Sequence, residues 1–358
     1  MENNQLNELE GKVLPIVLPP PIYYSLFAAD KLSMIMLNEN AKNWLYNNFI
    51  QLVFYAQNLE KMRYDSHYVS IWPVDTMKMD YSGANKFLRE YHINDKMYNL
   101  TRENLIDNIK NWIDCGFYII GYVDVTKLHG TRYYGFPAYS HSAMLIGYND
   151  KELYQVDFSP RGNIDILRIT YEDYIEAVFS EELQVIFKEK KHMDFKFSFS
   201  LFELKDAFRS ECKLDLNVMK FWTKSFVDGD DCGITTDFFM RRDELITGIN
   251  VYDNMLKLVD IMVDNNNDID YKMFHAVYEH KLIMKDRVSY LLAQDYLNHN
   301  QELLNIAQKN LEITQILRNY VLKYNFTHNK KIIDKISQNM QLLKLQEYDF
   351  MNAFYNEL

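Results

Sequence analysis

The clearest alternation of apolar and polar positions lies between residues 138 and 162. Two short apolar runs, Ser142–Tyr148 and Leu153–Asp157, flank the polar triplet Asn149–Lys151. Asn and Asp tolerate the left-handed backbone that closes a tight turn, and runs of this length are typical of strands. The pattern therefore predicts a β-hairpin.

Helical spacing comes before the hairpin. Apolar side chains recur at intervals of three and four residues over residues 26–37, where Ser25 is a favourable N-cap. The same spacing occurs over residues 101–113, where Thr101 is the expected cap. Both segments are expected to form helices that bury one face.

Three further segments complete the first half of the chain. The nearly continuous apolar run 117–125 is typical of a strand in the middle of a sheet. Residues 82–91 are expected to form a helix. Residues 47–57 fit either a strand or a short helix, and the pattern does not choose between them.

From about residue 195 the apolar period is helical almost throughout. A charged cluster at residues 188–192 is interpreted as a solvated boundary, so the chain is expected to divide into domains 1–192 and 193–358. Asp268 or Asp270 is the expected cap of the longest helix. The predicted helices of the second domain are 199–209, 215–221, 238–245, 250–263, 270–297, 301–324 and 330–354.

The hairpin carries the first candidate chemistry. His141 stands at the start of its first strand and Asp157 at the end of its second, and these ends lie side by side in a hairpin. A carboxylate beside an imidazole fixes the ring tautomer and stabilises its charged form. The alternative is an ordinary strand-end His and a turn Asp. Asp124, at the end of the 117–125 run, is a weaker rival to Asp157.

The same residues carry a resemblance. The order of His, apolar run, Gly-Tyr, turn, apolar run and Asp resembles the second half of papain-like and bacteriocin-processing peptidase domains. The string YQVDFSPRGNIDILRITYEDYIEA and residues 270–291 resemble the butirosin biosynthesis protein H-like family. That family contains acyltransferases of cysteine-peptidase fold associated with nonribosomal peptide assembly lines, including the amide-forming enzyme of closthioamide biosynthesis.

The resemblance implies an α+β fold. Its first part would be a papain-like cysteine-peptidase domain, in which a central helix packs on an antiparallel sheet, and an all-helical bundle would follow. It also implies transfer of an acyl group from the thioester of an acyl or peptidyl carrier protein to a small-molecule amine. The carrier's phosphopantetheine arm would bring the substrate, and no cofactor of the chain's own is expected. A peptidase would use the same residues.

In papain-like folds the reactive Cys opens the central helix, where the helix N-terminus lowers the thiol pKa. This chain has no Cys there. Ser25 is the candidate nucleophile, either in its own right or as a replacement of a Cys. Alternatively the replaced position is Ala28 or Ala29, and Ser25 is only a cap. A catalytically silent binding or scaffold protein, or a hydrolase inactivated by loss of its Cys, is therefore the alternative function.

Composition narrows the classes of partner. The 358 residues carry a formal net charge of −11, which argues against nucleic acid or an anionic membrane as the default partner. No apolar run approaches the ~18 residues of a membrane span, and the first residues lack the features of a signal peptide. We therefore expect a cytoplasmic protein.

The remaining candidates are weaker. Three cysteines, Cys115, Cys212 and Cys232, show no ligand spacing and are interpreted as reduced thiols, and no metal site is expected. Cys115 could be a displaced nucleophile, but a small buried apolar role is favoured. His129 could contact substrate, but a solvated loop position is favoured.

Overall fold

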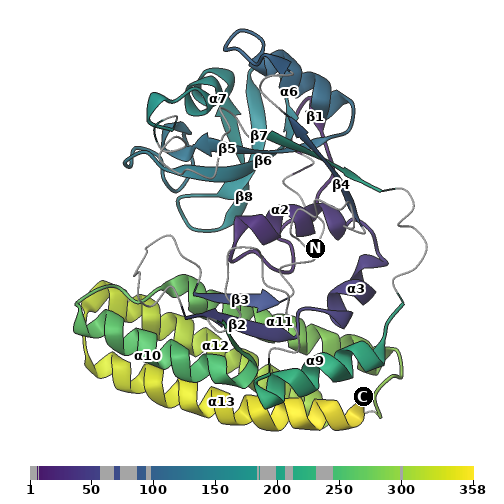
Figure 1. The fold of residues 1–358 in the computed structure, drawn as a ribbon, viewed down its shortest axis with the longest axis vertical. Coiled ribbons are helices and arrows are strands. Elements are labelled where there is room, and N and C mark those ends of the chain that lie inside the picture. The colour runs from purple at the N-terminus through teal and green to yellow at the C-terminus, as the bar shows by residue number, and fades with distance from the viewer. Residues whose placement is uncertain are drawn as a thin grey trace. The chain divides into compact units, whose positions relative to one another are not determined.

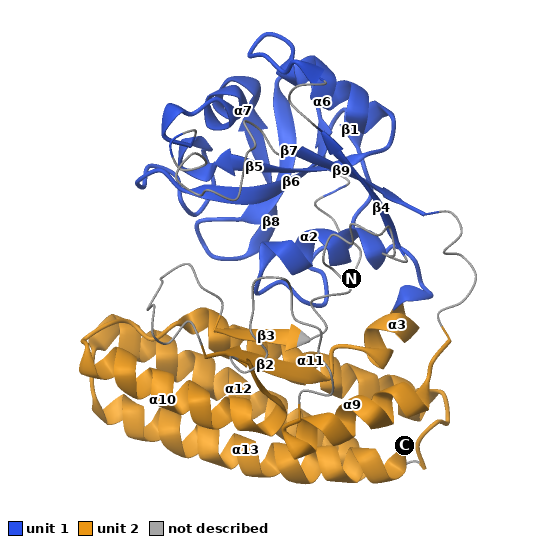
Figure 2. Ribbon diagram, viewed as in Figure 1, with its two compact units in different colours: residues 1–41, 77–211 blue, residues 42–76, 212–358 orange. Residues whose placement is uncertain are grey.

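The computed structural model describes residues 6, 8–56, 68–72, 87–93, 98–183, 185, 199–205, 213–230, 245–298 and 301–358. The chain forms two compact units (Figure 2). Unit 1 contains residues 1–41 and 77–211, and unit 2 contains residues 42–76 and 212–358. The predicted α+β class with antiparallel sheets is confirmed (Figure 1), and most of the C-terminal part is helical, but residues 193–358 are not all-helical as expected, because two strands, at residues 199–204 and 245–247, lie among them.

Unit 1 is built on one antiparallel sheet. Its strand order is β4-β9-β5-β6-β7-β8, and β1 pairs with β6 outside this path. The strands are β1 (Lys12–Val13), β4 (Leu88–Ile93), β5 (Tyr118–Asp124), β6 (Ser140–Tyr148), β7 (Glu152–Phe158), β8 (Ile164–Thr170) and β9 (Phe199–Leu204).

Three helices pack on this sheet. The helix α2 (Leu26–Ile35) lies against β6, and the helices α6 (Leu105–Asp114) and α7 (Tyr171–Val178) lie against β5. The first two helices were predicted from apolar spacing and are confirmed. The cap of α6 is Asn104 rather than Thr101, because residues 102–104 form a turn before the helix begins.

The hairpin prediction is confirmed by β6 and β7. Asn149 closes the turn, because its Oδ1 accepts hydrogen bonds from the backbone N–H groups of Lys151 and Glu152 at 2.8 and 2.9 Å. The apolar run 117–125 is confirmed as β5, a strand with neighbours on both sides.

Two predicted helices are strands. The described part of segment 82–91 begins β4, and the described part of segment 199–209 is β9. These strands pair with each other in register Leu88↔Leu204 to Ile93↔Phe199. Tertiary pairing overrides local helical spacing here, because each segment gains a complete ladder from a distant partner. The strand β9 also belongs to unit 1, although it follows the expected boundary at residue 192.

Unit 2 joins a small sheet to long helices. The sheet has strand order β10-β2-β3, with β10 (Leu245–Thr247), β2 (Gln51–Tyr55) and β3 (Val69–Trp72). The ambiguous segment 47–57 thus contains a strand, which follows the helix α3 (Ala41–Asn47). The other helices are α9 (Leu216–Asp228), α10 (Val251–Asp264), α11 (Tyr271–Ala293), α12 (Gln301–Thr327) and α13 (Lys331–Glu357).

Long helices that follow one another in the sequence pack together: α11 packs against α12, and α12 against α13. The helix α11 also packs against β3. Asp270 caps α11, because its side chain accepts a hydrogen bond from the N–H of Lys272 at 2.9 Å. The prediction of Asp268 or Asp270 as the cap is thus confirmed for Asp270. The predicted segment 238–245 falls outside the described residues except for Leu245, which begins β10.

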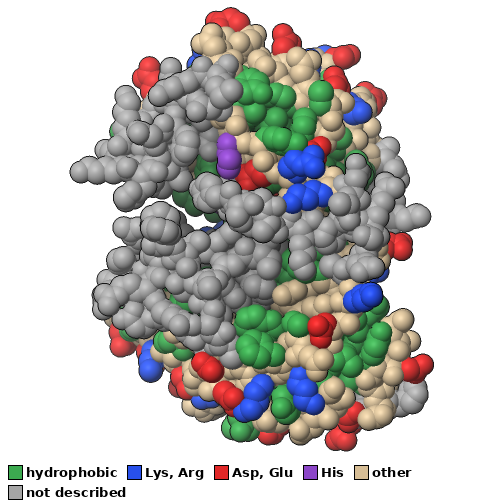
Figure 3. Space-filling model, turned by 45° about the vertical axis from the view of Figure 1, so that its right-hand side comes forward, with side chains coloured by type: hydrophobic (Ala, Val, Ile, Leu, Met, Phe, Trp, Pro, Cys, Tyr) green, Lys and Arg blue, Asp and Glu red, His purple; other side chains and the backbone are tan. Residues whose placement is uncertain are grey.

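The charge on one face of the molecule is mixed. Among the described side chains on the face drawn in Figure 3, basic and acidic groups are interspersed, and no extended basic surface forms there. Within the part of the chain that the structure describes, no helix combines the length and apolar character needed to cross a membrane.

Candidate active site

Ser25 opens α2 as predicted. Its backbone is extended, with φ −133° and ψ 129°, and its carbonyl accepts hydrogen bonds from the N–H groups of Ala28 and Ala29. Its side chain makes no capping hydrogen bond. Ala28 and Ala29 are only 5% and 0% exposed, whereas Ser25 is half-buried. Of the three candidate positions, Ser25 is therefore the one with a side chain that solvent reaches.

His141 lies near the start of β6. Its Nδ1 is 2.8 Å from the carbonyl oxygen of Ser142. A carbonyl oxygen only accepts, so Nδ1 carries the proton and the neutral ring has its lone pair on Nε2. The rings of Tyr133 and Tyr139 lie with their centroids 6.2 and 5.7 Å from the imidazole. A backbone carbonyl therefore sets the tautomer of His141.

Asp157 lies near the end of β7 and is 2% exposed. Its Oδ2 accepts a hydrogen bond from Nε2 of Gln155 at 3.0 Å, and its Oδ1 accepts one from the N–H of Phe158 at 2.6 Å. Burial raises the pKa of Asp157 to about 7, and these two hydrogen bonds oppose the rise.

The three predicted residues share unit 1, but they are not joined as a triad. Among the described residues, no hydrogen bond or ion pair connects Asp157 to His141, or His141 to Ser25. The carboxylate that was expected to orient the imidazole is bonded instead to Gln155 and Phe158. The predicted orienting role of Asp157 therefore differs from its observed contacts.

Sequence reasoning missed Asp30. This residue lies within α2, is 1% exposed, and neither of its carboxylate oxygens has a hydrogen-bond partner in the described structure. Burial raises the pKa of Asp30 well above 3.8, the charge of Asp157 raises it further, and the charge of Lys31 opposes the rise. Asp30 and Asp157 are thus two buried carboxyl groups close enough for the charge of Asp157 to act on Asp30. The available signal was a charge within the apolar run LFAADKLSMI.

Lys31 does not neutralise this pair. Its Nζ lies 3.3 Å from the ring centroid of Phe27, and within the described structure it makes no ion pair with Asp30. Burial lowers the pKa of Lys31 to about 8, and the charges of Glu90 and Asp30 oppose that shift. The ammonium is held by an aromatic face rather than by the neighbouring carboxylate.

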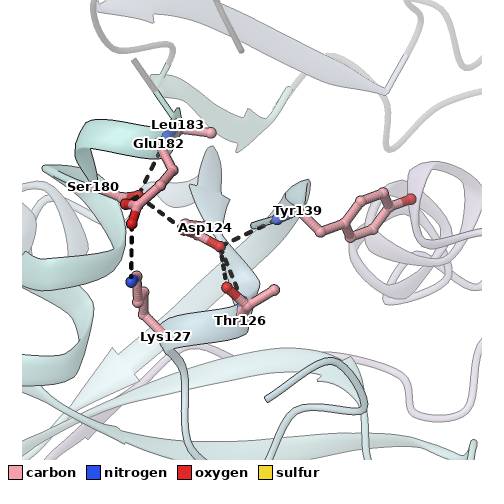
Figure 4. A network of polar contacts seen from close by, with 7 residues as sticks. All are labelled: Asp124, Thr126, Lys127, Tyr139, Ser180, Glu182 and Leu183. Carbon is pink, nitrogen blue, oxygen red and sulfur yellow. Dashed lines mark hydrogen bonds and ion pairs between the residues drawn. The ribbon is translucent and has the colours of Figure 1, made fainter. Parts of the chain in front are cut away.

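Asp124, the rival candidate, has a structural role, because it hydrogen-bonds to several segments of unit 1 (Figure 4). Its Oδ1 accepts hydrogen bonds from Oγ1 of Thr126 at 2.6 Å and from the N–H of Tyr139 at 3.3 Å. Its Oδ2 accepts one from Oγ of Ser180 at 2.8 Å. The side chain is 0% exposed, so this carboxylate is buried with its partners in place. It joins the end of β5 to the loop before β6 and to the segment after α7.

A hydrogen-bonded pair of a His and a carboxylate lies at another place in unit 1. Nδ1 of His129 is 2.9 Å from Oδ2 of Asp173, and the ring of His129 lies 4.0 Å from that of Tyr134. His129 is exposed, as favoured from the sequence. Cys115 ends α6 and is exposed, so its predicted burial is wrong. Cys212 and Cys232 lie outside the described residues.

Unit 2 contains its own buried polar network. His280 donates a hydrogen bond from Nε2 to the carbonyl oxygen of Ile50 at 2.7 Å, and its Nδ1 accepts one from Nζ of Lys281 at 2.9 Å. Nζ of Lys281 is also 2.6 Å from Oε1 of Glu347, whose Oε2 accepts a hydrogen bond from Asn310 at 2.9 Å. Burial and the Lys281 charge hold the pKa of His280 well below 6.5, so the ring is neutral.

No group of three or more His, Cys, Asp or Glu side chains is arranged to hold a metal ion within the described parts of the chain. Comparison with known proteins gives no protein-family model that matches the chain and no matching curated protein. The assignment of a function therefore depends on the chemistry of these residues.

Proposed function

We propose that unit 1 is an acyltransferase domain of papain-like architecture, with Ser25 as nucleophile and His141 as base. The observation that carries this proposal is the Ser25 hydroxyl. It stands at the N-terminus of a helix that packs on β6, and it takes no part in capping that helix. Backbone N–H groups at a helix N-terminus stabilise an oxyanion, which acyl transfer requires.

The proposed chemistry has two steps. Nε2 of His141 takes the proton of the Ser25 hydroxyl while the hydroxyl oxygen attacks the thioester carbon. The carbon–sulfur bond breaks, the imidazolium returns the proton to the leaving thiolate, and an acyl ester remains on Ser25. An amine then attacks the ester carbon and gives a proton to Nε2. The ester bond breaks, Ser25 regains its proton, and an amide is released.

The donor in this proposal is the thioester of an acyl or peptidyl carrier protein, and the chain acts in the cytoplasm. The carrier, the amine acceptor and the biosynthetic setting come from the family resemblance alone. The cytoplasmic location is consistent with Cys115, which is an exposed free thiol.

A binding or scaffold protein without activity is the second candidate. The observation that favours it is the replaced nucleophile, because no Cys stands at the start of α2. Such a protein would keep the fold of unit 1 and bind the acylated carrier without forming an ester.

Intact mass spectrometry separates the two candidates. The full chain is incubated with an acyl thioester of N-acetylcysteamine, which imitates the end of a phosphopantetheine arm. We expect a covalent acyl adduct on the wild-type chain that is absent from Ser25→Ala and from His141→Ala. The matched control is Ser33→Ala, a second serine on α2, which should keep the adduct.

Two further results would decide against the proposal. An adduct that persists in Ser25→Ala would place the nucleophile elsewhere. If neither the wild-type chain nor Ser25→Cys forms an adduct while carrier binding persists, the chain is a binding protein. A gain of adduct in Ala28→Cys or Ala29→Cys alone would move the nucleophile position to that residue.

A further inference from the structure

Several buried acceptor atoms around Asp157 have no donor. Both carboxylate oxygens of Asp30 and Oε1 of Gln155 are buried and unpartnered among the described residues. Gln155 is 0% exposed and its amide donates to Asp157, so it belongs to the same neighbourhood. Buried acceptors without partners are rare, and a cluster of them indicates a missing donor.

The charged and titratable neighbours do not supply this donor. From α2, Lys31 is held against the ring of Phe27. On β5, burial raises the pKa of the Tyr122 phenol, and the charge of Asp30 raises it further. In the loop before β6, burial raises the pKa of Tyr133, and the charge of Asp157 also raises it. The charge of Lys31 acts on Asp30, but among the described residues no cation forms an ion pair or hydrogen bond with the Asp30 carboxylate.

Aromatic rings lie beside the cluster. The centroids of Tyr133 and Tyr139 are 4.9 Å apart, and both rings pack near the imidazole of His141. These three side chains are half-buried, whereas the two carboxyls are buried. Aromatic faces attract organic cations, and desolvation strengthens that attraction.

We infer that this neighbourhood binds the ammonium group of a ligand, with Asp30, Asp157 and Oε1 of Gln155 as acceptors and Tyr133 and Tyr139 against its carbon chain. A primary ammonium carries three N–H donors, which suits three acceptor groups. Calcium and magnesium take six or more oxygen ligands and usually retain water, which suits an aromatic neighbourhood poorly.

Within the proposed function, this ligand is the acyl acceptor: it enters as a primary ammonium, gives one proton to a carboxylate of the site, and attacks the ester carbon as the neutral amine. That identification rests on the proposed function, but ammonium binding itself requires no acyl transfer. The site thus specifies the acceptor as a primary amine rather than an alcohol or a second thiol.

The test uses the full chain without any acyl donor. Binding of n-butylamine and of butan-1-ol is measured at pH 8 by titration calorimetry and by the shift in Tm, with sodium chloride matched between samples. We expect butylammonium to bind and raise Tm, and butan-1-ol to do neither. Asp30→Asn and Asp157→Asn should each weaken amine binding by about tenfold or more, because each removes a hydrogen bond to a charged group.

The control variant is Asp173→Asn, whose carboxylate contacts the exposed His129 and should not affect amine binding. Equal binding of the alcohol, an equal Tm rise from sodium ions, unchanged affinity in both Asp variants, or no amine binding would each overturn the inference. If Asp157→Asn does not fold, Asp30→Asn decides the question, because it removes an unpaired buried charge.

Failure of this inference differs from failure of the proposed function. Amine binding without any acyl adduct would leave the ammonium site in place and remove the acyltransferase. An acyl adduct on Ser25 in a chain that does not distinguish amine from alcohol would do the reverse.

Discussion

The two units bury charged side chains in opposite ways. In unit 2, Lys281 lies 2.6 Å from Glu347, and His280 and Asn310 bond to the two ends of this pair. In unit 1, Asp30 and Asp157 have like charge, and Asp30 has no hydrogen-bond partner in the described structure. One arrangement pairs its charges, and the other leaves them unneutralised.

The difference shows what each group contributes. A buried ion pair with further hydrogen bonds tolerates its desolvation, and its loss leaves a single charge behind. A buried carboxyl without a partner has no such compensation and favours its neutral form. The network of unit 2 therefore serves the fold, whereas the carboxyl pair of unit 1 costs stability, which the ammonium site proposed above would account for.

The largest expected effect comes from breaking the paired network. Lys281→Met leaves the Glu347 carboxylate buried without its cation, and we expect a loss of about 3–5 kcal/mol in the free energy of unfolding. Urea unfolding followed by circular dichroism measures it. The double variant Lys281→Met/Glu347→Leu should recover most of the loss, and a double variant as unstable as the single one would contradict the interpretation.

Asp124 sharpens the comparison inside unit 1, because it is a buried carboxylate with its partners in place. Asp124→Asn removes the negative charge and replaces one of the two oxygens that accept from Thr126, Tyr139 and Ser180 by an NH2 donor, and we expect a loss of about 2–3 kcal/mol. The measurement is the urea midpoint at pH 7. Equal stability of variant and wild type would mean that these hydrogen bonds add nothing.

Asp30→Asn should act with the opposite sign. The change removes an unpartnered buried charge, and we expect a gain of about 1–2 kcal/mol in the stability of unit 1 at pH 8. Hydrogen exchange of β6 and β7 amides measures this unit directly. Lower protection in the variant would show that the Asp30 carboxylate has a stabilising partner.

The pH dependence follows from Asp157. Its pKa rises from 3.8 in the unfolded chain to about 7 in the folded one, so its stabilising contribution is fully present below pH 3.8. That contribution is lost as pH rises towards 7, by at most about 1.4 kcal/mol for each pH unit. Hydrogen exchange of unit 1 between pH 4 and 7 should therefore show a slope that Asp157→Asn flattens. An equal slope in the variant would contradict the assignment.

The smallest effect is expected at an exposed ion pair in unit 2. Lys224 lies 2.6 Å from Asp228, at the same distance as the buried pair, but both side chains are solvated. Lys224→Met should leave the urea midpoint unchanged, because exposed pairs contribute little. This variant is the matched control for Lys281→Met, since distance is equal and burial differs.

Local patterns predicted the elements that local interactions determine. Helix α2 and the β6–β7 hairpin follow from the spacing of their own apolar residues and from Asn149 in the turn. The strands β4 and β9 could not be predicted in this way. Leu88 pairs with Leu204, and nothing in either segment reveals a partner so distant in sequence.

The candidate site also has features that the sequence predicts and features that only the folded chain shows. The hairpin pattern predicted the strands that carry His141 and Asp157. It did not predict the hydrogen-bond partners of these side chains, which are the carbonyl of Ser142 for His141, and Gln155 and Phe158 for Asp157. Asp30 was visible in the sequence as a charge among apolar residues. Its proximity to Asp157 arises only when α2 packs on the sheet, so spacing could not reveal the pair.

The chain passes between its two units three times, and this order has a consequence for synthesis on the ribosome. The described strands of unit 1 have all emerged by residue 211, but β2 pairs with β10 and packs against α9 and α10, which are still to come. At ordinary translation rates, a nascent chain needs about 10–40 s to proceed from β2 to β10. During that time β2, with the apolar sequence QLVFY, lacks its β10 partner. We therefore expect holdase chaperones to bind the nascent chain at this segment.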